Sequence, residues 1–228
     1  MDTDKLNALS PFEFKDQLIK LASTHAEAMM LNAGRGNPNF LATQPRHAFL
    51  RLGDFALKEA ERSYAYLSHG FGGIPEKTGI VERFDAYALL NEATPGIDFI
   101  QSTLSFAIDH LGIKKHDLLY ELTAAYLACN YPFPPRMLPL CERITKVYLS
   151  TELCGTKTKT DAFDIFATEG GTAAMTYLFQ SLFANRILHK GDKVALISPI
   201  FSPYLEIPPI PAYDLEVIDI KASEDQNW

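Results

Sequence analysis

The 228-residue chain has the composition of a folded protein, because 47% of its residues are hydrophobic and 11% are aromatic. Its 28 acidic and 21 basic residues give a formal net charge of -7, and no run of Lys or Arg provides the basic surface that nucleic-acid binding requires. The three cysteines lack disulfide or zinc spacing, the N-terminus is polar, and no apolar stretch approaches the about 18 residues that span a bilayer, so we expect a cytoplasmic protein without metal or membrane.

Most of the chain before residue 160 shows helical patterns. A capping box formed by Ser10 and Glu13, with Pro11 at the first helical position, predicts the start of the first helix. Glycine and proline interrupt the pattern at 31–40 and 63–73, where we predict loops. The predicted helices cover residues 11–24, 45–62, 138–152 and most of 80–127, with breaks at 94–96 and 111–113.

From Ala162 the pattern changes to strand, helix and strand, which indicates a parallel α/β layer. Strands are predicted at 163–167, 192–197 and 215–220. We expect Lys190 and Gly191 to end the intervening helix, with a basic last turn and a glycine cap. Right-handed connections bring the loops after the first two strands to the carboxyl edge of the sheet, where open α/β sheets bind their ligands.

Two motifs follow these first two strands. The segment Glu169-Gly-Gly-Thr172 turns into the helix and offers backbone N–H groups, the positive end of the helix dipole and a threonine hydroxyl to a phosphate. It is neither a Walker A loop nor a dinucleotide fingerprint. From this motif alone, a glycine turn without a ligand is an equally good interpretation. Phe201, in Ser198-Pro-Ile-Phe-Ser-Pro-Tyr204, offers a ring that can stack on an aromatic cofactor or pack in the core.

Together these motifs resemble the first half of the aspartate aminotransferase fold, the fold type I of enzymes that use pyridoxal 5'-phosphate. More narrowly, the chain is similar from about residue 6 onward to the family of aspartate 4-decarboxylases that also act as aspartate aminotransferases. Four motifs carry this resemblance, in the family's order: Leu9-Ser-Pro-Phe-Glu-Phe-Lys15, Leu31-Asn-Ala-Gly-Arg-Gly-Asn-Pro-Asn-Phe40, Cys129-Asn-Tyr-Pro-Phe-Pro-Pro-Arg-Met137 and Glu169-Gly-Gly-Thr-Ala-Ala-Met175.

The resemblance implies pyridoxal phosphate as the cofactor and L-aspartate with a 2-oxo acid as substrates. It also implies a homo-oligomer whose active site lies at a dimer interface, because Tyr66 matches a tyrosine that reaches the cofactor phosphate of a neighbouring subunit. The remaining cofactor contacts that it implies are Gly170, Gly171 and Thr172 at the phosphate and Phe201 on the pyridine ring. The implied substrate contacts are Arg35, Gly36, Lys15 and Gly112. A core or surface tyrosine and a solvated lysine are the ordinary alternatives for Tyr66 and Lys15.

The family's Schiff-base lysine, in a Ser-x-Ser-Lys segment, has no counterpart in these residues, so we expect no catalytic residue here and an inactive isolated chain. The resemblance implies the amino-terminal portion of a larger enzyme, with an incomplete parallel sheet. Its predicted parts are an arm and small-domain part at 1–80, a helical insertion and linker at 81–160, and the start of the cofactor-binding domain at 161–228. Two alternatives stay open: an inert product that binds partner subunits, and a different α/β enzyme that binds another phosphate.

Overall fold

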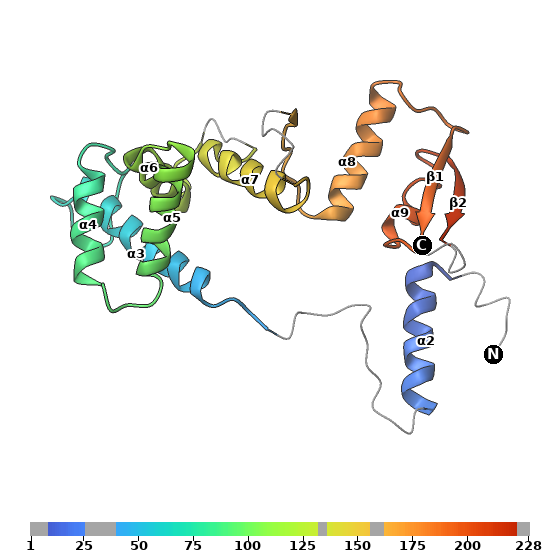
Figure 1. Ribbon diagram of the computed structural model, residues 1–228, viewed down its shortest axis with the longest axis horizontal. Coiled ribbons are helices and arrows are strands. Elements are labelled where there is room, and N and C mark those ends of the chain that lie inside the picture. The colour runs from blue at the N-terminus through green and yellow to red at the C-terminus, as the bar shows by residue number, and fades with distance from the viewer. Residues whose placement is uncertain (1–8, 26–39, 132–135, 156–161, 223–228) are drawn as a thin grey trace. The chain divides into compact units, whose positions relative to one another are not determined.

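The computed structural model describes residues 9–25, 40–131, 136–155 and 162–222 (Figure 1). Its contacts divide the chain into two compact units. Residues 38–167 form a helical unit, and residues 1–37 together with 168–228 form an α/β unit. The domain ranges 1–80, 81–160 and 161–228 that the sequence predicts refer to the domains of a larger enzyme, and they stay a prediction.

The helical unit contains the helices that the sequence patterns predict. Residues 80–127 break into three helices because Gly96 and Gly112 both adopt left-handed backbone conformations, with φ of 100° and 61°. The helices are α3 (Gln44–Ser63), α4 (Ile80–Leu90), α5 (Ile97–Leu111), α6 (Lys115–Tyr126) and α7 (Pro139–Glu152). Figure 1 shows α3 to α6 gathered into one bundle.

A continuous apolar core holds α3, α4, α5 and α6 together. The rings of Phe55 and Phe84 meet edge to face at 5.2 Å, and both are almost completely buried. Tyr87 packs beside them and donates a hydrogen bond of 2.8 Å from its hydroxyl to Asp54. The carboxylate of Glu59 on α3 is also buried and is paired with Arg83 on α4.

Helix α7 begins on a carboxylate supplied by α6. Glu121 accepts hydrogen bonds from the backbone N–H groups of Leu140 at 3.0 Å and Cys141 at 3.2 Å. The first N–H groups of a helix have no intrahelical acceptor, and a negative charge there also interacts favourably with the helix dipole. Glu121 therefore serves as the cap of a neighbouring helix.

The described residues of the α/β unit include two parallel strands, in agreement with the predicted α/β class. Strand β1 (Lys193–Ser198) pairs with β2 (Glu216–Lys221), in a register that places Lys193 opposite Glu216. Phe179 of helix α8 (Gly171–Ala184) is buried with Tyr213 and Leu215, which precede β2, and Val194 of β1 packs against this cluster. The unit also contains the short α9 (Pro203–Glu206) and α2 (Pro11–His25).

The predicted capping box of α2 is formed. The backbone N–H of Ser10 donates to Glu13 at 3.0 Å, and the N–H of Glu13 donates to the Ser10 hydroxyl at 3.3 Å. The hydrogen bonds that the Glu13 carboxylate accepts from Ser10, first from the backbone N–H and then from the hydroxyl, lower the pKa of the Glu13 carboxyl. The sequence therefore located this helix start correctly.

Two local predictions are wrong. Residues 163–167 form no strand: they alternate between partly buried and exposed side chains, but no strand in the part of the chain that the structure describes pairs with them. Helix α8 ends at Ala184 with Asn185 as its C-cap, six residues before Lys190, because the chain takes a left-handed conformation at Arg186 with φ of 57°. Lys190, in the turn before β1, instead donates from its Nζ to the carbonyl of Pro211, which precedes β2.

None of the helices among the described residues has the length and apolar character needed to cross a membrane.

Candidate functional site

The chain enters α8 through a turn that only glycine adopts readily. Gly170, the N-cap, has φ of 114° and ψ of 174°, a region that side chains with a Cβ rarely occupy. The Thr168 hydroxyl donates to the Gly170 carbonyl at 3.1 Å, and the N–H of Ala174 donates to the same carbonyl at 3.0 Å. The turn is thus fixed on both sides of the glycine.

Gly171 has a different explanation from Gly170. Its φ lies outside the left-handed region, and a Cβ added to it would meet no atom within 4 Å. Neither backbone strain nor packing within the described chain therefore requires glycine at this position. Close approach of a ligand to the backbone would require it, as at phosphate-binding helix starts.

The start of α8 has the donors that an anion requires. Its first turn contains no acidic residue, its N-cap has no side-chain hydrogen bond, and Thr172 places an exposed hydroxyl-bearing side chain beside the first N–H groups. These N–H groups have no intrahelical acceptor and point along the positive end of the dipole. The residues present therefore fit a phosphate group.

A pair beside this turn was missed by the sequence reasoning. Tyr177, two turns along α8, donates a hydrogen bond of 3.1 Å from its hydroxyl to the carboxylate of Glu169, just before the N-cap. Glu169 lies outside the helix, so no periodic spacing in the sequence indicated this contact. The pair positions the segment that leads into the glycine turn.

Phe201 lies in the loop that leaves β1. Its side chain is 59% exposed and contacts Tyr204 edge to face at 6.1 Å, so it is no core residue of the described chain. Figure 1 shows β1 running opposite to α8, so the carboxyl end of β1 and the first turn of α8 face the same end of the α/β unit. This arrangement is the one that lets two such loops serve one ligand.

The other candidate residues lie elsewhere. Tyr66 belongs to the helical unit, where its ring is 78% exposed and contacts Tyr64 at 5.9 Å. Lys15 lies on α2 and forms an ion pair of 3.0 Å with Asp16. Arg35 and Gly36 lie outside the described residues.

Gly112 has a structural role that the sequence reasoning did not identify. It is the C-cap of α5 in a left-handed conformation, and its N–H donates to the carbonyl of Ile108 at 3.2 Å. A left-handed helix cap accounts for glycine here without a ligand. Contact with aspartate at this position stays a prediction.

The fold and the turn together define an α/β protein with a phosphate-type helix start and an exposed aromatic ring on a neighbouring loop. Along its whole length the chain is related to a Pseudomonas sp protein, the bifunctional aspartate aminotransferase and L-aspartate beta-decarboxylase, with 48% identity over 227 residues. The match covers 100% of this chain and 43% of that protein, so the chain spans less than half of its relative's length. No family model matches the chain. The relationship confirms the resemblance that the four motifs indicated.

Proposed function

We propose that this chain forms part of a pyridoxal phosphate enzyme that converts L-aspartate to alanine and carbon dioxide, and that also transfers its amino group to a 2-oxo acid. The 48% identity along the whole chain supports the reaction class. The observation that carries the cofactor assignment is Gly171, for which the fold itself gives no reason while a closely bound phosphate does.

In this proposal the first turn of α8 binds the cofactor phosphate. The N–H groups of Gly171 and Thr172 and the Thr172 hydroxyl donate to its oxygens, and Gly170 provides the turn that aims them. Phe201, whose ring is exposed, would hold the pyridine ring by stacking. When bound, the cofactor would supply an electron sink for the substrate carbon, while these residues of the chain would bind and orient it.

The substrate contacts rest on the resemblance. Arg35 is proposed to bind the second carboxylate of aspartate bidentately, with the Gly36 backbone beside the substrate. Lys15 on α2 and Gly112 at the end of α5 are further proposed contacts. Lys15 already pairs with Asp16 and would exchange that partner for the substrate carboxylate.

Tyr66 is proposed to act across a subunit boundary. Its ring is 78% exposed although its loop is well connected, which suits a residue that meets a neighbouring subunit. Its hydroxyl would donate to the cofactor phosphate of that subunit in a homo-oligomer. The covalent anchor of the cofactor is assigned to none of these 228 residues, because no lysine among them stands in a Ser-x-Ser-Lys segment.

The test uses the complete enzyme and two substitutions in the first turn. Gly171→Ala adds a methyl group where the fold leaves space, so the unfolding midpoint should stay the same or rise while pyridoxal phosphate affinity falls. Thr172→Ala should weaken cofactor binding by about tenfold or more, because hydrogen bonds to charged groups contribute about 1.5–3 kcal/mol. Equilibrium dialysis measures the dissociation constant.

The matched control is Thr176→Ala, one turn further along α8. The Thr176 hydroxyl donates to the Thr172 carbonyl at 3.0 Å, so this change removes a threonine hydroxyl without touching the proposed phosphate contacts. Unchanged cofactor affinity in Gly171→Ala and Thr172→Ala would refute the assignment. For the isolated 228-residue chain, we expect no borohydride-sensitive visible absorption band.

A further inference from the structure

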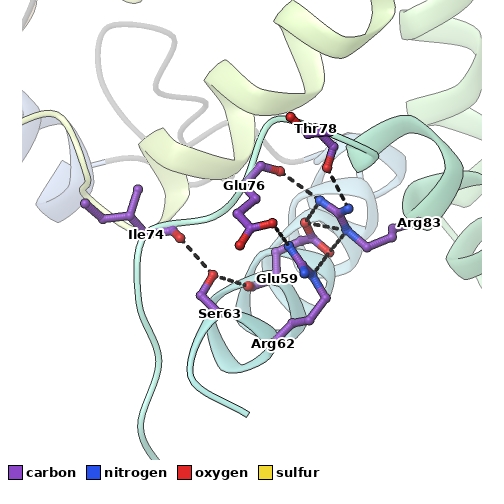
Figure 2. Close-up of polar contacts among 7 residues, drawn as sticks. All are labelled: Glu59, Arg62, Ser63, Ile74, Glu76, Thr78 and Arg83. Carbon is purple, nitrogen blue, oxygen red and sulfur yellow. Dashed lines mark hydrogen bonds and ion pairs between the residues drawn. The ribbon is translucent and has the colours of Figure 1, made fainter. Parts of the chain in front are cut away.

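The loop that carries Tyr66 is closed by contacts between its two ends. This loop, residues 64–79, leaves the C-terminus of α3 and returns along it before α4 begins (Figure 2). The N–H of Gly73 donates a hydrogen bond to the Ala60 carbonyl at 2.9 Å, and the Ser63 hydroxyl donates one to the Ile74 carbonyl at 2.8 Å. The returning segment is therefore bound to the last two turns of α3.

An ion pair between Glu59 and Arg83 supports this closed loop. Arg83 on α4 donates through Nε to Glu59 Oε1 at 2.7 Å and through Nη2 to Glu59 Oε2 at 2.6 Å, which is a bidentate geometry. The side chain of Glu59 on α3 is only 3% exposed. The pair thus joins the two helices that frame the loop.

The same guanidinium also holds the returning segment directly. Arg83 Nη1 donates to the Thr78 carbonyl and Nη2 to the Glu76 carbonyl, both at 2.8 Å. Arg62 adds a side-chain contact of 3.3 Å to Glu76 and lies 3.6 Å from Glu59 (Figure 2). A single buried carboxylate therefore orients two arginines, and both reach the loop.

Stability alone does not account for this arrangement. A buried ion pair loses much of its attraction to desolvation, and a well-packed apolar pair of similar volume often serves stability equally well. An apolar pair would not donate to the carbonyls of residues 76 and 78. What the ion pair adds is a fixed path for the loop backbone.

The fixed backbone is connected to Tyr66 through Tyr64. A Cβ on Gly73 would lie 2.1 Å from Cε2 of Tyr64, so the Tyr64 ring lies directly against the returning segment. The ring of Tyr64 in turn contacts that of Tyr66. We propose that Glu59 and Arg83 are positioning residues, which hold the loop so that Tyr66 is presented to the cofactor phosphate of a neighbouring subunit. The target of Tyr66 rests on the proposed function above, whereas the holding of the loop does not.

The experiment uses the complete enzyme and two mild substitutions, Arg83→Lys and Ser63→Ala. Lysine retains the charge but cannot donate to Glu59 and two carbonyls in the same planar geometry. Ser63→Ala removes the hydroxyl that reaches the Ile74 carbonyl. Its matched control is Ser102→Ala on α5, where the hydroxyl donates to the Asp98 carbonyl within its own helix.

The first readout is amide hydrogen exchange of residues 64–79 in the enzyme without cofactor. We expect about two- to tenfold faster exchange in Ser63→Ala, more in Arg83→Lys, and no change in Ser102→Ala. Unchanged exchange of this loop in both test variants would overturn the inference. This readout does not depend on what Tyr66 binds.

The second readout is the dissociation constant of pyridoxal phosphate, in a double-mutant cycle of Arg83→Lys with Tyr66→Phe. If the pair acts through Tyr66, the two substitutions together should weaken binding hardly more than Tyr66→Phe alone. Fully additive effects would overturn the positioning role. If Thr172→Ala weakens binding and Tyr66→Phe does not, the proposed target of Tyr66 is wrong, and loop exchange still decides whether the pair holds the loop.

Discussion

The helical unit and the α/β unit differ in how completely they bury their own apolar residues. Among the described residues, fourteen buried side chains form the core of the helical unit, whereas three form that of the α/β unit. Three isoleucines of the strands stay 44–67% exposed: Ile197, Ile218 and Ile220. The unit with the larger core is therefore not the unit that contains the candidate cofactor turn, which lies in the α/β unit.

The difference also affects how local sequence relates to structure. Helices α3 to α6 each bury an apolar face, and helical periodicity reveals that face whichever neighbour covers it. A strand is stable only when another strand pairs with it, and its local pattern does not reveal the partner. Strands are therefore harder to predict from local sequence than helices are.

The largest expected losses of stability come from replacing a buried phenylalanine by alanine in each of the two cores. Phe84→Ala removes a ring with 0% exposure that packs on Phe55 and Tyr87, and it should lower the free energy of unfolding by about 4–5 kcal/mol. Phe179→Ala should lower it by about 3 kcal/mol, because the partly exposed neighbours of Phe179 can move into the cavity. Urea titration followed by circular dichroism measures both.

An exposed phenylalanine of the helical unit provides the control. Phe106 on α5 is 43% exposed, and Phe106→Ala should change the free energy of unfolding by no more than about 0.5 kcal/mol. Hydrogen exchange locates each loss within its own unit. An equal loss in the two cores, or one that spreads over both units, would remove the distinction between them.

Much of the helical unit could be predicted from the sequence, and the exceptions have physical reasons. The break at Gly112 is a local signal and is formed, as is the capping box at Ser10 in the α/β unit. The bond between Glu59 and Arg83 joins residues 24 positions apart, and nothing in the local pattern indicates it. Residues 163–167 show the alternation of a strand but have no partner strand.

The sequence predicted which kinds of residue form the candidate site better than it predicted how their side chains contact one another. The glycine turn at Gly170 and the helix that follows it were recognisable because φ preferences and helix starts are local properties. The contact of Tyr177 with Glu169 and the closure of the Tyr66 loop depend on side-chain packing. The proposed contact of Tyr66 with a neighbouring subunit depends on contacts outside a single chain.

A smaller effect is expected where one helix of the helical unit caps another. Glu121→Gln removes the charge that the N–H groups of Leu140 and Cys141 share, and it should cost about 1 kcal/mol, as lost caps do. Thermal unfolding measures this loss. Glu152→Gln, at the exposed last turn of α7, should change stability by only a few tenths of a kcal/mol.

The thiol of Cys141 reports on the same contact. Burial, followed by the charge of Glu121, raises the pKa of Cys141 to about 11. In Glu121→Gln this pKa should fall, so alkylation of Cys141 at pH 9 should become faster while that of the exposed Cys154 stays the same. Equal alkylation rates of Cys141 with and without the substitution would show that Glu121 does not act on the start of α7.

The last prediction concerns the stability of the helical core at alkaline pH. Burial, aided by the hydrogen bond to Asp54, raises the pKa of Tyr87 from 10.0 to about 12. A raised pKa in the folded state means that this contribution to stability is complete below pH 10 and is lost as the pH rises through about 12. The melting temperature should therefore fall across this window, and Tyr87→Phe should make the fall shallower. Tyr148→Phe, which changes a side chain that is 61% exposed on α7, should leave the slope unchanged. If the Tyr87→Phe curve ran parallel to that of the unchanged protein, the alkaline loss would come from groups outside the helical core.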